Sequence, residues 1–309
     1  MKRILVFAGI LAVLICASSC NVEELDPTSV IVDNSPAPTD FDIWLDYNYR
    51  IPYNIRYIYR YEDIEVDRGH DWAPIKELNA RIIARIISYM WLDPYGEVAG
   101  DDFMRETSPR VIQVLGSLAY NDNGSVTLGL AEGGLKVTLM GLNDLEGKAE
   151  IIYNNGVDET DGYTVIPDIS GLSSMLIVMH HEFMHIICGK KPFPAEFALI
   201  SKDDYAAQWT SISASAAAKM GFVTNYASGA YGEDIAEVYS HYVSMSEEEW
   251  QALHDLAGEE GSQKIERKLA IVRQYMKDSW NIDIDRLKDV VARRAAESVW
   301  LDWDNYNVE

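Results

Sequence analysis

The chain has 309 residues, of which 48% are hydrophobic and 24% are charged. This length and composition allow one substantial hydrophobic core or two small domains, and they exclude a chain that is disordered throughout. The formal net charge of −23 disfavours binding to nucleic acid or to an anionic membrane surface.

The N-terminus has the pattern of a signal peptide. Lys2 and Arg3 precede an apolar run over residues 4–15, which is too short for a membrane-spanning helix. The run leads to the sequence ASSC at residues 17–20, which resembles a bacterial lipobox with cleavage before Cys20 and lipidation of its thiol. An ordinary secretory signal with an incidental cysteine is the alternative. Because two of the three cysteines fall in this region, a disulfide framework in the mature chain is excluded.

These features predict three parts of the chain. Residues 1–19 form the signal peptide, and residues 20–40 form the lipidated cysteine and a flexible tether rich in Pro, Ser, Thr and Asp. Residues 41–309 form one folded domain. Aromatic residues crowd its beginning, from Phe41 to Trp72. They could bind sugar or peptide, but we favour packing with hydrogen-bonded tips, which is the more common use of such residues.

The domain begins with a strand and a long helix. Alternation from Ile55 to Tyr61 predicts the strand. A helical apolar stripe from Ile75 to Met90 predicts the helix, which is expected to end near the Asp-Pro pair at residues 93–94.

Residues 110–139 are predicted to form β structure. Strands are expected at residues 111–115, 126–130 and 135–140. Residues 121–124 have the chemistry of a hairpin turn, so strand 126–130 is predicted to pair with strand 111–115 as its return strand. A Gly-Gly pair at 133–134 is predicted to form the turn before strand 135–140. The stretch from 143 to 168 has a looser pattern, without a predicted element.

A central helix is predicted over residues 172–188. Its apolar residues recur at spacings of three and four and cover most of its circumference. Ser170 is the expected N-cap, and Gly189 is the expected C-terminal stop. The helix should therefore be buried on most sides.

This helix carries the motif H-E-x-x-H as His181, Glu182 and His185. Residues four apart lie on one face of a helix, so both imidazoles can reach one ion, and Glu182 can reach a water beside it. Two imidazoles, a third ligand and an open position for water form a typical catalytic zinc site, with a glutamate as general base. The alternative is a pair of hydrogen-bonded histidines in a core helix, where polar groups are costly unless something satisfies them.

The third ligand is expected downstream. Residues 202–220 are predicted to be helical, and residues 221–232 form a loop that carries Tyr226 and Tyr231. The next segment, residues 232–239, has a helical apolar stripe and places two glutamates on one face. After it the chain is predicted to be mostly helical to its end, with a helix start near residue 246.

The glutamate pair, Glu233 and Glu237, resembles that of the gluzincin metallopeptidases. In that pattern the first glutamate binds zinc and the second acidic residue orients a ligand histidine. The resemblance implies Zn²⁺ held by His181, His185 and Glu233, with Glu237 behind a histidine. Asp234 is a rival ligand, because some zincins use aspartate. It lies about 100° around the helix from Glu233, and we favour Glu233 because Glu237 then falls one turn further on.

The combined segments resemble a family of zinc-binding metallopeptidase lipoproteins, described as substrate import-associated zinc metallohydrolase lipoproteins. The matching parts are the lipobox, the hairpin region at residues 120–134, the motif at 181–185 and the acidic segment at 232–237. The resemblance implies an α+β, zincin-like fold, in which a small mixed or antiparallel sheet packs on the active-site helix and a mostly helical part follows. An edge strand of the sheet would hold an extended substrate by backbone pairing.

The implied reaction is hydrolysis of a peptide bond by zinc-activated water, with residues 41–309 as the catalytic domain. Glu182 would act as the general base, and Tyr226 would stabilise the oxyanion, as a tyrosine does in some gluzincins. Tyr231 is the alternative donor. Met184 replaces a small residue of many such enzymes and is expected to crowd the cleft. Two other functions stay open: a surface substrate-binding lipoprotein with a structural or vestigial zinc site, and hydrolysis of a non-peptide amide.

The resemblance also implies a cellular setting. Members of the family are associated with outer-membrane nutrient import, alongside a TonB-dependent transporter and a substrate-binding lipoprotein. We therefore expect a peptide or protein substrate and attachment to the outer membrane of a Gram-negative bacterium through a lipid anchor at Cys20. Acidic residues after Cys20 are similar to an export signal of surface-displayed lipoproteins, which favours display outward over a periplasmic location. No nucleic-acid partner is expected.

Overall fold

The computed structural model describes most of the chain from residue 37 onward. The described residues are 37–62, 66, 69–121, 124–144, 149–157, 159–167, 169–298 and 301. The predicted signal peptide, Cys20 and most of the predicted tether lie outside them. Within the described ranges, no helix combines the length and the apolar character needed to cross a membrane.

The first helices pack aromatic side chains against the strand β1 (Arg56–Ile58). They are α2 (Asp40–Leu45), a π-helical turn (Asp46–Arg50) and α3 (Ile51–Tyr53). Thr39 caps α2, because its side chain accepts a hydrogen bond from the backbone of Asp42. The packing interpretation of the aromatic segment is confirmed by its buried members, which are Phe41, Trp44, Tyr49, Tyr57 and Tyr59.

The predicted helix end at Asp93-Pro94 is wrong. Helical structure continues through α4 (Glu77–Ile87), a π-helical turn (Ser88–Leu92) and α5 (Asp93–Ala99), and α6 (Asp101–Thr107) follows. Pro94 lies at the start of α5, directly after the π-helical turn. We attribute the continuation to that wider turn, because a proline ring inside a regular α-helix meets the carbonyl four residues before it.

Four short strands form a mixed sheet in the order β1-β2-β6-β5. The others are β2 (Val111–Val114), β5 (Gly129–Glu132) and β6 (Lys136–Leu139). β1, β2 and β6 are parallel, whereas β5 is antiparallel to β6 across the predicted turn. That turn contains Gly133 and Gly134, whose φ values of 58° and 69° favour glycine. β5 thus lies at an edge of the sheet.

The predicted return strand of β2 is wrong. Instead, β3 (Ala119–Tyr120) pairs with β4 (Val126–Thr127) in a separate two-stranded ribbon. β2 pairs with β1 and β6, which are distant in sequence. Turn chemistry predicts a hairpin locally, but it does not determine which distant strand lies beside each partner.

A second hairpin lies in the stretch that showed only a loose pattern. It consists of β7 (Ala149–Tyr153) and β8 (Tyr163–Pro167), which pair antiparallel over their full length. Both segments contain β-branched and aromatic residues, which are the ordinary signal for strands. The prediction of no element there is therefore wrong, although the sequence carried a local signal for one.

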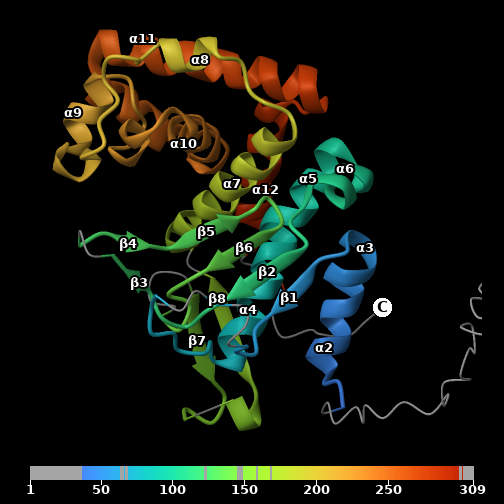
Figure 1. Ribbon diagram of the computed structural model, residues 1–309. Coiled ribbons are helices and arrows are strands. Elements are labelled where there is room, and N and C mark those ends of the chain that lie inside the picture. Colours follow the sequence, from blue (N-terminus) through green and yellow to red (C-terminus); the bar gives the residue numbers. More distant parts are fainter. Residues whose placement is uncertain are drawn as a thin grey trace, which may run out of the picture. The chain divides into compact units, whose positions relative to one another are not determined.

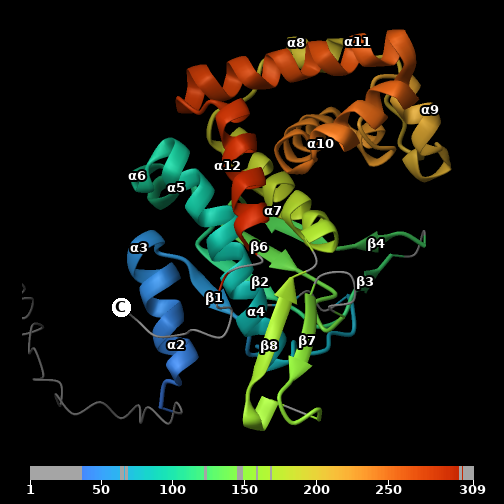
Figure 2. The same cartoon turned by 180° about the vertical axis from the view of Figure 1, so that it is seen from behind.

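The predicted central helix is confirmed as α7 (Ile169–Lys190), which is longer at both ends than expected. It continues through Gly189, so the predicted stop is wrong. Met179, Phe183 and Met184 are fully buried on it. Figures 1 and 2 show α7 between the sheet and α10 (Tyr231–Ser244).

The segment between α7 and α10 is less helical than predicted. It contains the short helices α8 (Glu196–Leu199) and α9 (Ala214–Lys219) and two 3₁₀ turns (Trp209–Ser211 and Tyr226–Gly229). The predicted helix at residues 202–220 is thus mostly wrong. Even alanine, the strongest helix former, does not stabilise a short helix by itself, because most helical stability in proteins comes from packing of an apolar stripe against a partner.

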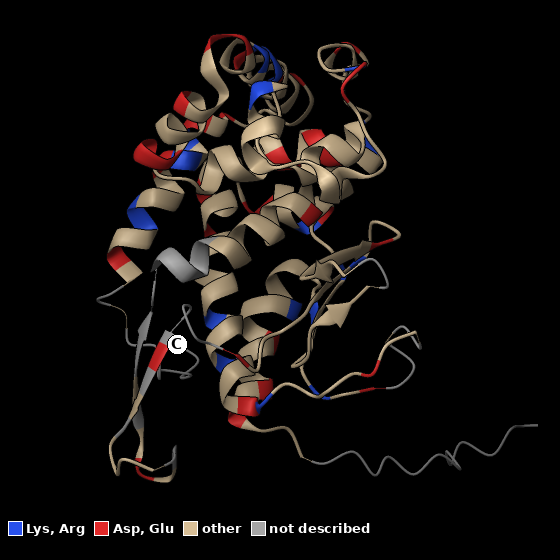
Figure 3. Cartoon of the chain, turned by 90° about the vertical axis from the view of Figure 1, so that its left-hand side faces the viewer, with Lys and Arg blue, Asp and Glu red and all other residues tan. Residues whose placement is uncertain are grey.

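The C-terminal part is mostly helical, as predicted. α10 is followed by α11 (Glu247–Trp280) and α12 (Ile284–Glu297). Ser246 and Glu249 form the capping box at the start of α11. α11 is broken at Gly258, whose φ of 67° lies outside the helical region. Acidic and basic residues are interspersed over these helices (Figure 3). The described part of the chain is a mixed α+β structure with a small sheet.

Candidate metal centre

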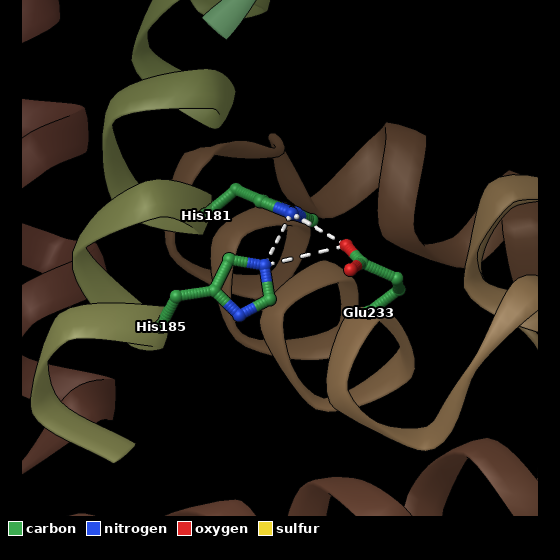
Figure 4. A group of neighbouring side chains, drawn as sticks. All are labelled: His181, His185 and Glu233. Atoms are coloured by element: carbon green, nitrogen blue, oxygen red, sulfur yellow. Dashed lines mark hydrogen bonds and ion pairs between the residues drawn. The ribbon is translucent and has the colours of Figure 1, made fainter. Parts of the chain in front are cut away.

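Two histidines of α7 and one glutamate of α10 meet where the two helices pack (Figure 4). The Nε2 atoms of His181 and His185 are 3.0 Å apart. Oε2 of Glu233 lies 3.1 Å from Nε2 of His181 and 3.3 Å from Nε2 of His185. The helical spacing brings the two imidazoles to one face of α7, and the packing of α10 brings the carboxylate to them.

Glu237 lies one turn further along α10 and holds the other side of His181. Its Oε1 is 2.7 Å from Nδ1 of His181, and its Oε2 accepts a hydrogen bond from the hydroxyl of Thr224 at 2.6 Å. A carboxylate at Nδ1 favours the tautomer that carries its proton there. Nε2 of His181, which faces His185 and Glu233, is then the nitrogen available to a metal ion.

The donor atoms fit a zinc ion. Nε2 of both histidines and a carboxylate oxygen of Glu233 lie within 4.8 Å of one another. Burial lowers the pKa of His181, but its hydrogen bonds with Glu233 and Glu237 outweigh burial and raise the pKa to about 10. The pocket thus favours a positive charge at this point. Two imidazoles and a carboxylate are a usual ligand set of catalytic zinc.

Glu182 is buried between the two histidines and the edge strand. The backbone N–H of Ala131 in β5 donates a hydrogen bond to its carboxylate. Burial raises the pKa of Glu182 above its ordinary value, although the neighbouring histidines lower it. A buried carboxylate with a raised pKa is suited to accept and return a proton.

Gly129 lets the edge strand pass close to α7. A Cβ atom at this position would lie 2.3 Å from Cγ1 of Val178 and 3.5 Å from Oε1 of Glu182. A larger residue would therefore push β5 away from the helix. No sequence pattern predicts this contact, because it depends on how the strand crosses α7.

A cavity of about 440 Å³ lies over these residues. Its lining residues include Thr127, Gly129, His181, Glu182, Trp209, Tyr226 and Glu237. The cavity therefore brings together the edge strand, the motif helix and the loop before α10. Its walls offer polar and aromatic groups to a ligand.

The structure distinguishes the two tyrosines of the loop. The ring centres of Tyr226 and His181 are 5.9 Å apart, and the Tyr226 hydroxyl forms a hydrogen bond with Glu233. Tyr231 is 57% exposed, and its ring packs near Phe193 at 6.1 Å. Tyr226 thus faces the metal centre, whereas Tyr231 does not line its cavity.

Asp234 and Met184 are both buried away from the metal centre. Asp234 is not part of the His-Glu cluster, because its carboxylate is fully buried against Lys268 at 2.6 Å. Met184 is fully buried in the hydrophobic core and does not line the cavity, so the expected crowding of the cleft is wrong. Both side chains lie on faces of their helices that turn away from the site.

Sequence reasoning missed several residues of the site. Thr224 holds Glu237, and Trp209 packs on Tyr226 with ring centres 5.0 Å apart. Both lie in irregular segments, where periodicity does not indicate which way a side chain points. A polar residue shortly before the tyrosine was the only available signal for Thr224, and it is a weak one.

Comparison with known proteins agrees with this geometry. A crystal structure described as that of a "putative zinc-binding metallo-peptidase from Bacteroides caccae ATCC 43185" is 40% identical in sequence, with a TM-score of 0.69. The similarity covers 87% of this chain and 96% of that one. Among functionally curated proteins, none matches the chain. A family described as "Putative zinc-binding metallo-peptidase" matches residues 34–285, which is most of the chain, and the chain therefore belongs to that family.

Proposed function

We propose that the protein is a zinc-dependent peptidase with a zincin-like fold. The observation that carries the proposal is the position of Glu182. It lies between a His-Glu cluster that fits zinc and the edge strand β5, at one cavity. A purely structural zinc site needs no buried carboxylate beside its ligands, whereas hydrolysis needs a general base.

The mechanism uses five side chains at the metal centre. His181, His185 and Glu233 would hold the zinc ion, which when bound acts as a Lewis acid and lowers the pKa of water to about 7. Glu182 accepts a proton from the attacking water and delivers it to the leaving nitrogen. Glu237 keeps the His181 ring oriented through Nδ1.

We propose an extended peptide as the substrate. β5 is at the edge of its sheet and can pair with the backbone of an added strand. Leu128 and Leu130, which are 46% and 43% exposed, lie at this edge and can contact apolar side chains of such a peptide. Backbone pairing would place one peptide bond next to Glu182.

The direct test is digestion of a peptide library derived from a proteome. We expect zinc-loaded protein to cleave a defined set of peptides, chelation to abolish cleavage, and added zinc to restore it. Stoichiometric zinc without any cleavage would contradict a peptidase and favour a binding lipoprotein. Cleavage of simple amides alone would favour a non-peptide amide as substrate.

Tyr226 is proposed to donate its hydroxyl proton in a hydrogen bond to the oxyanion. We expect Tyr226→Phe to lower kcat by about 10²-fold or more, as the loss of one oxyanion donor does, with zinc content unchanged. Tyr231→Phe is the matched control and should keep full activity, because Tyr231 lies outside the cavity. Equal effects of the two variants in a peptide cleavage assay would contradict this assignment.

We further propose that the protein is an outer-membrane lipoprotein, exposed at the cell surface, that works in nutrient import with a TonB-dependent transporter and a substrate-binding lipoprotein. The sequence at residues 17–20 and the acidic residues after it support this proposal. A degraded peptide could then be passed to the importer at the place where it is formed.

Lipidation at Cys20 predicts the distribution of the protein in the cell. Wild type should be found in the membrane fraction, since the several acyl chains of a mature bacterial lipoprotein anchor stably. Cys20→Ser should leave that fraction, whereas Cys188→Ser should stay in it. Fractionation with immunodetection checks this, and a membrane-bound Cys20→Ser variant would contradict the anchor.

A further inference from the structure

A buried lysine of α11 lies against the first turn of α10. Nζ of Lys268 is 2.6 Å from Oδ2 of Asp234, and both side chains are 0% exposed. The same ammonium donates a hydrogen bond to the carbonyl oxygen of Gly221 at 2.7 Å and lies 4.0 Å from the centre of the Phe222 ring. The hydroxyl of Tyr205 donates to Oδ2 of Asp234 at 2.8 Å. One cation thus joins α11, α10 and the loop before α10.

Stability alone is a weak reason for this contact. Two charges lose their hydration when they are buried, and a buried ion pair is often no more stabilising than apolar residues of similar volume. Oδ1 of Asp234 also has no hydrogen-bond partner among the described residues. The pair does restrict the orientation of α10 relative to α11, because a hydrogen-bonded ion pair allows few relative positions of the two helices.

The orientation of α10 matters because Asp234 is next to Glu233 in the sequence. Consecutive residues of a helix point about 100° apart. When Asp234 is held toward Lys268 on α11, Glu233 is turned toward α7, where it meets His181 and His185. The ion pair therefore sets the rotation of the first turn of α10 about its axis.

The loop that Lys268 holds also contributes to the site. Gly221 begins this loop, and Thr224 and Tyr226 follow within it. Thr224 donates to Glu237, and Tyr226 forms a hydrogen bond with Glu233. Holding the carbonyl of Gly221 therefore restrains the segment from which both groups reach α10.

We propose that Lys268 is a positioning residue of the metal centre, which acts through Asp234 and Gly221 to keep Glu233 facing the two histidines. Lys268 is a member of neither the His-Glu cluster nor the cavity lining. The inference rests on the role of Glu233 as a ligand in the proposed function. It predicts that zinc affinity depends on a pair that is buried behind the site.

The test replaces the pair by apolar residues, as Lys268→Met together with Asp234→Leu. Because such replacements are often neutral for stability, the double variant should fold with a melting temperature near that of wild type. Its zinc affinity, measured by competition with a chelator, should fall by about 10- to 100-fold, as it does when groups behind a ligand are lost. The rise in melting temperature on adding zinc should shrink accordingly.

The control is another ion pair of α11. Nε of Arg273 lies 3.0 Å from Oδ1 of Asp285, and their side chains are 36% and 54% exposed. Arg273→Met with Asp285→Leu should leave zinc affinity unchanged, because this pair joins α11 to α12 and contacts Tyr242, near the far end of α10.

Each outcome decides the proposal. Wild-type zinc affinity in the Lys268–Asp234 variant would overturn it, and so would an equal loss in the control. If that variant does not fold, Lys268→Met alone is tested for the zinc-induced rise in melting temperature. If Lys268→Met shows the same zinc-induced rise in melting temperature as wild type, the pair is purely structural. The same conclusion follows if Lys268→Met also fails to fold. If wild type itself binds no zinc, the proposed function fails instead.

Discussion

Glu182→Gln is expected to lower the rate of peptide cleavage by about 10²- to 10⁴-fold, which is the usual contribution of a positioned general acid or base. Glutamine has nearly the same shape and can still accept the hydrogen bond from the backbone of Ala131. It cannot accept a proton from water. Zinc content should stay at the wild-type level, because Glu182 is outside the His-Glu cluster.

The measurement is kcat and KM on a peptide identified by the library digest, with zinc determined in the same samples. Glu266→Gln is the control, because Glu266 lies on α11 beside His254 and outside the cavity. It should keep wild-type activity. Unchanged cleavage by Glu182→Gln would remove Glu182 from the mechanism, whereas loss of zinc in that variant would place it among the ligands.

The second large effect is a loss of zinc affinity when the glutamates of α10 are replaced. Glu233→Ala removes the anionic member of the cluster and should largely abolish zinc retention, as should His181→Ala or His185→Ala. Glu237→Ala leaves the cluster complete but frees Nδ1 of His181. Its zinc affinity should fall by about 10- to 100-fold, so the two glutamates are expected to differ clearly.

Competition with a chelator gives the affinities, and Glu260→Ala is the control because Glu260 is 86% exposed on α11. Asp234→Ala is not a suitable control. It leaves the buried Lys268 without its counter-ion, which typically costs about 3–5 kcal/mol of folding stability. If Glu237→Ala loses more zinc than Glu233→Ala, the roles assigned to the two glutamates are wrong.

The spacing of residues along the chain determined those features that depend on one helix or one turn. His181 and His185 share a face because they are four apart, and the same holds for Glu233 and Glu237. Gly133 and Gly134 predict their turn because few other residues adopt positive φ. Each of these features follows from backbone geometry within a few residues, so no distant contact was needed to predict it.

Only the tertiary structure decided the features that depend on how elements lie against one another. Spacing favoured Glu233 over Asp234 through Glu237 one turn further on, but it did not show which of the two faces α7. The rotation of α10 is set by its packing and by Lys268 on α11. Spacing cannot choose between the tyrosines of an irregular loop, and it cannot place β2 beside β1 and β6. These choices are made by contacts between residues far apart in sequence, and a local pattern carries no information about such contacts.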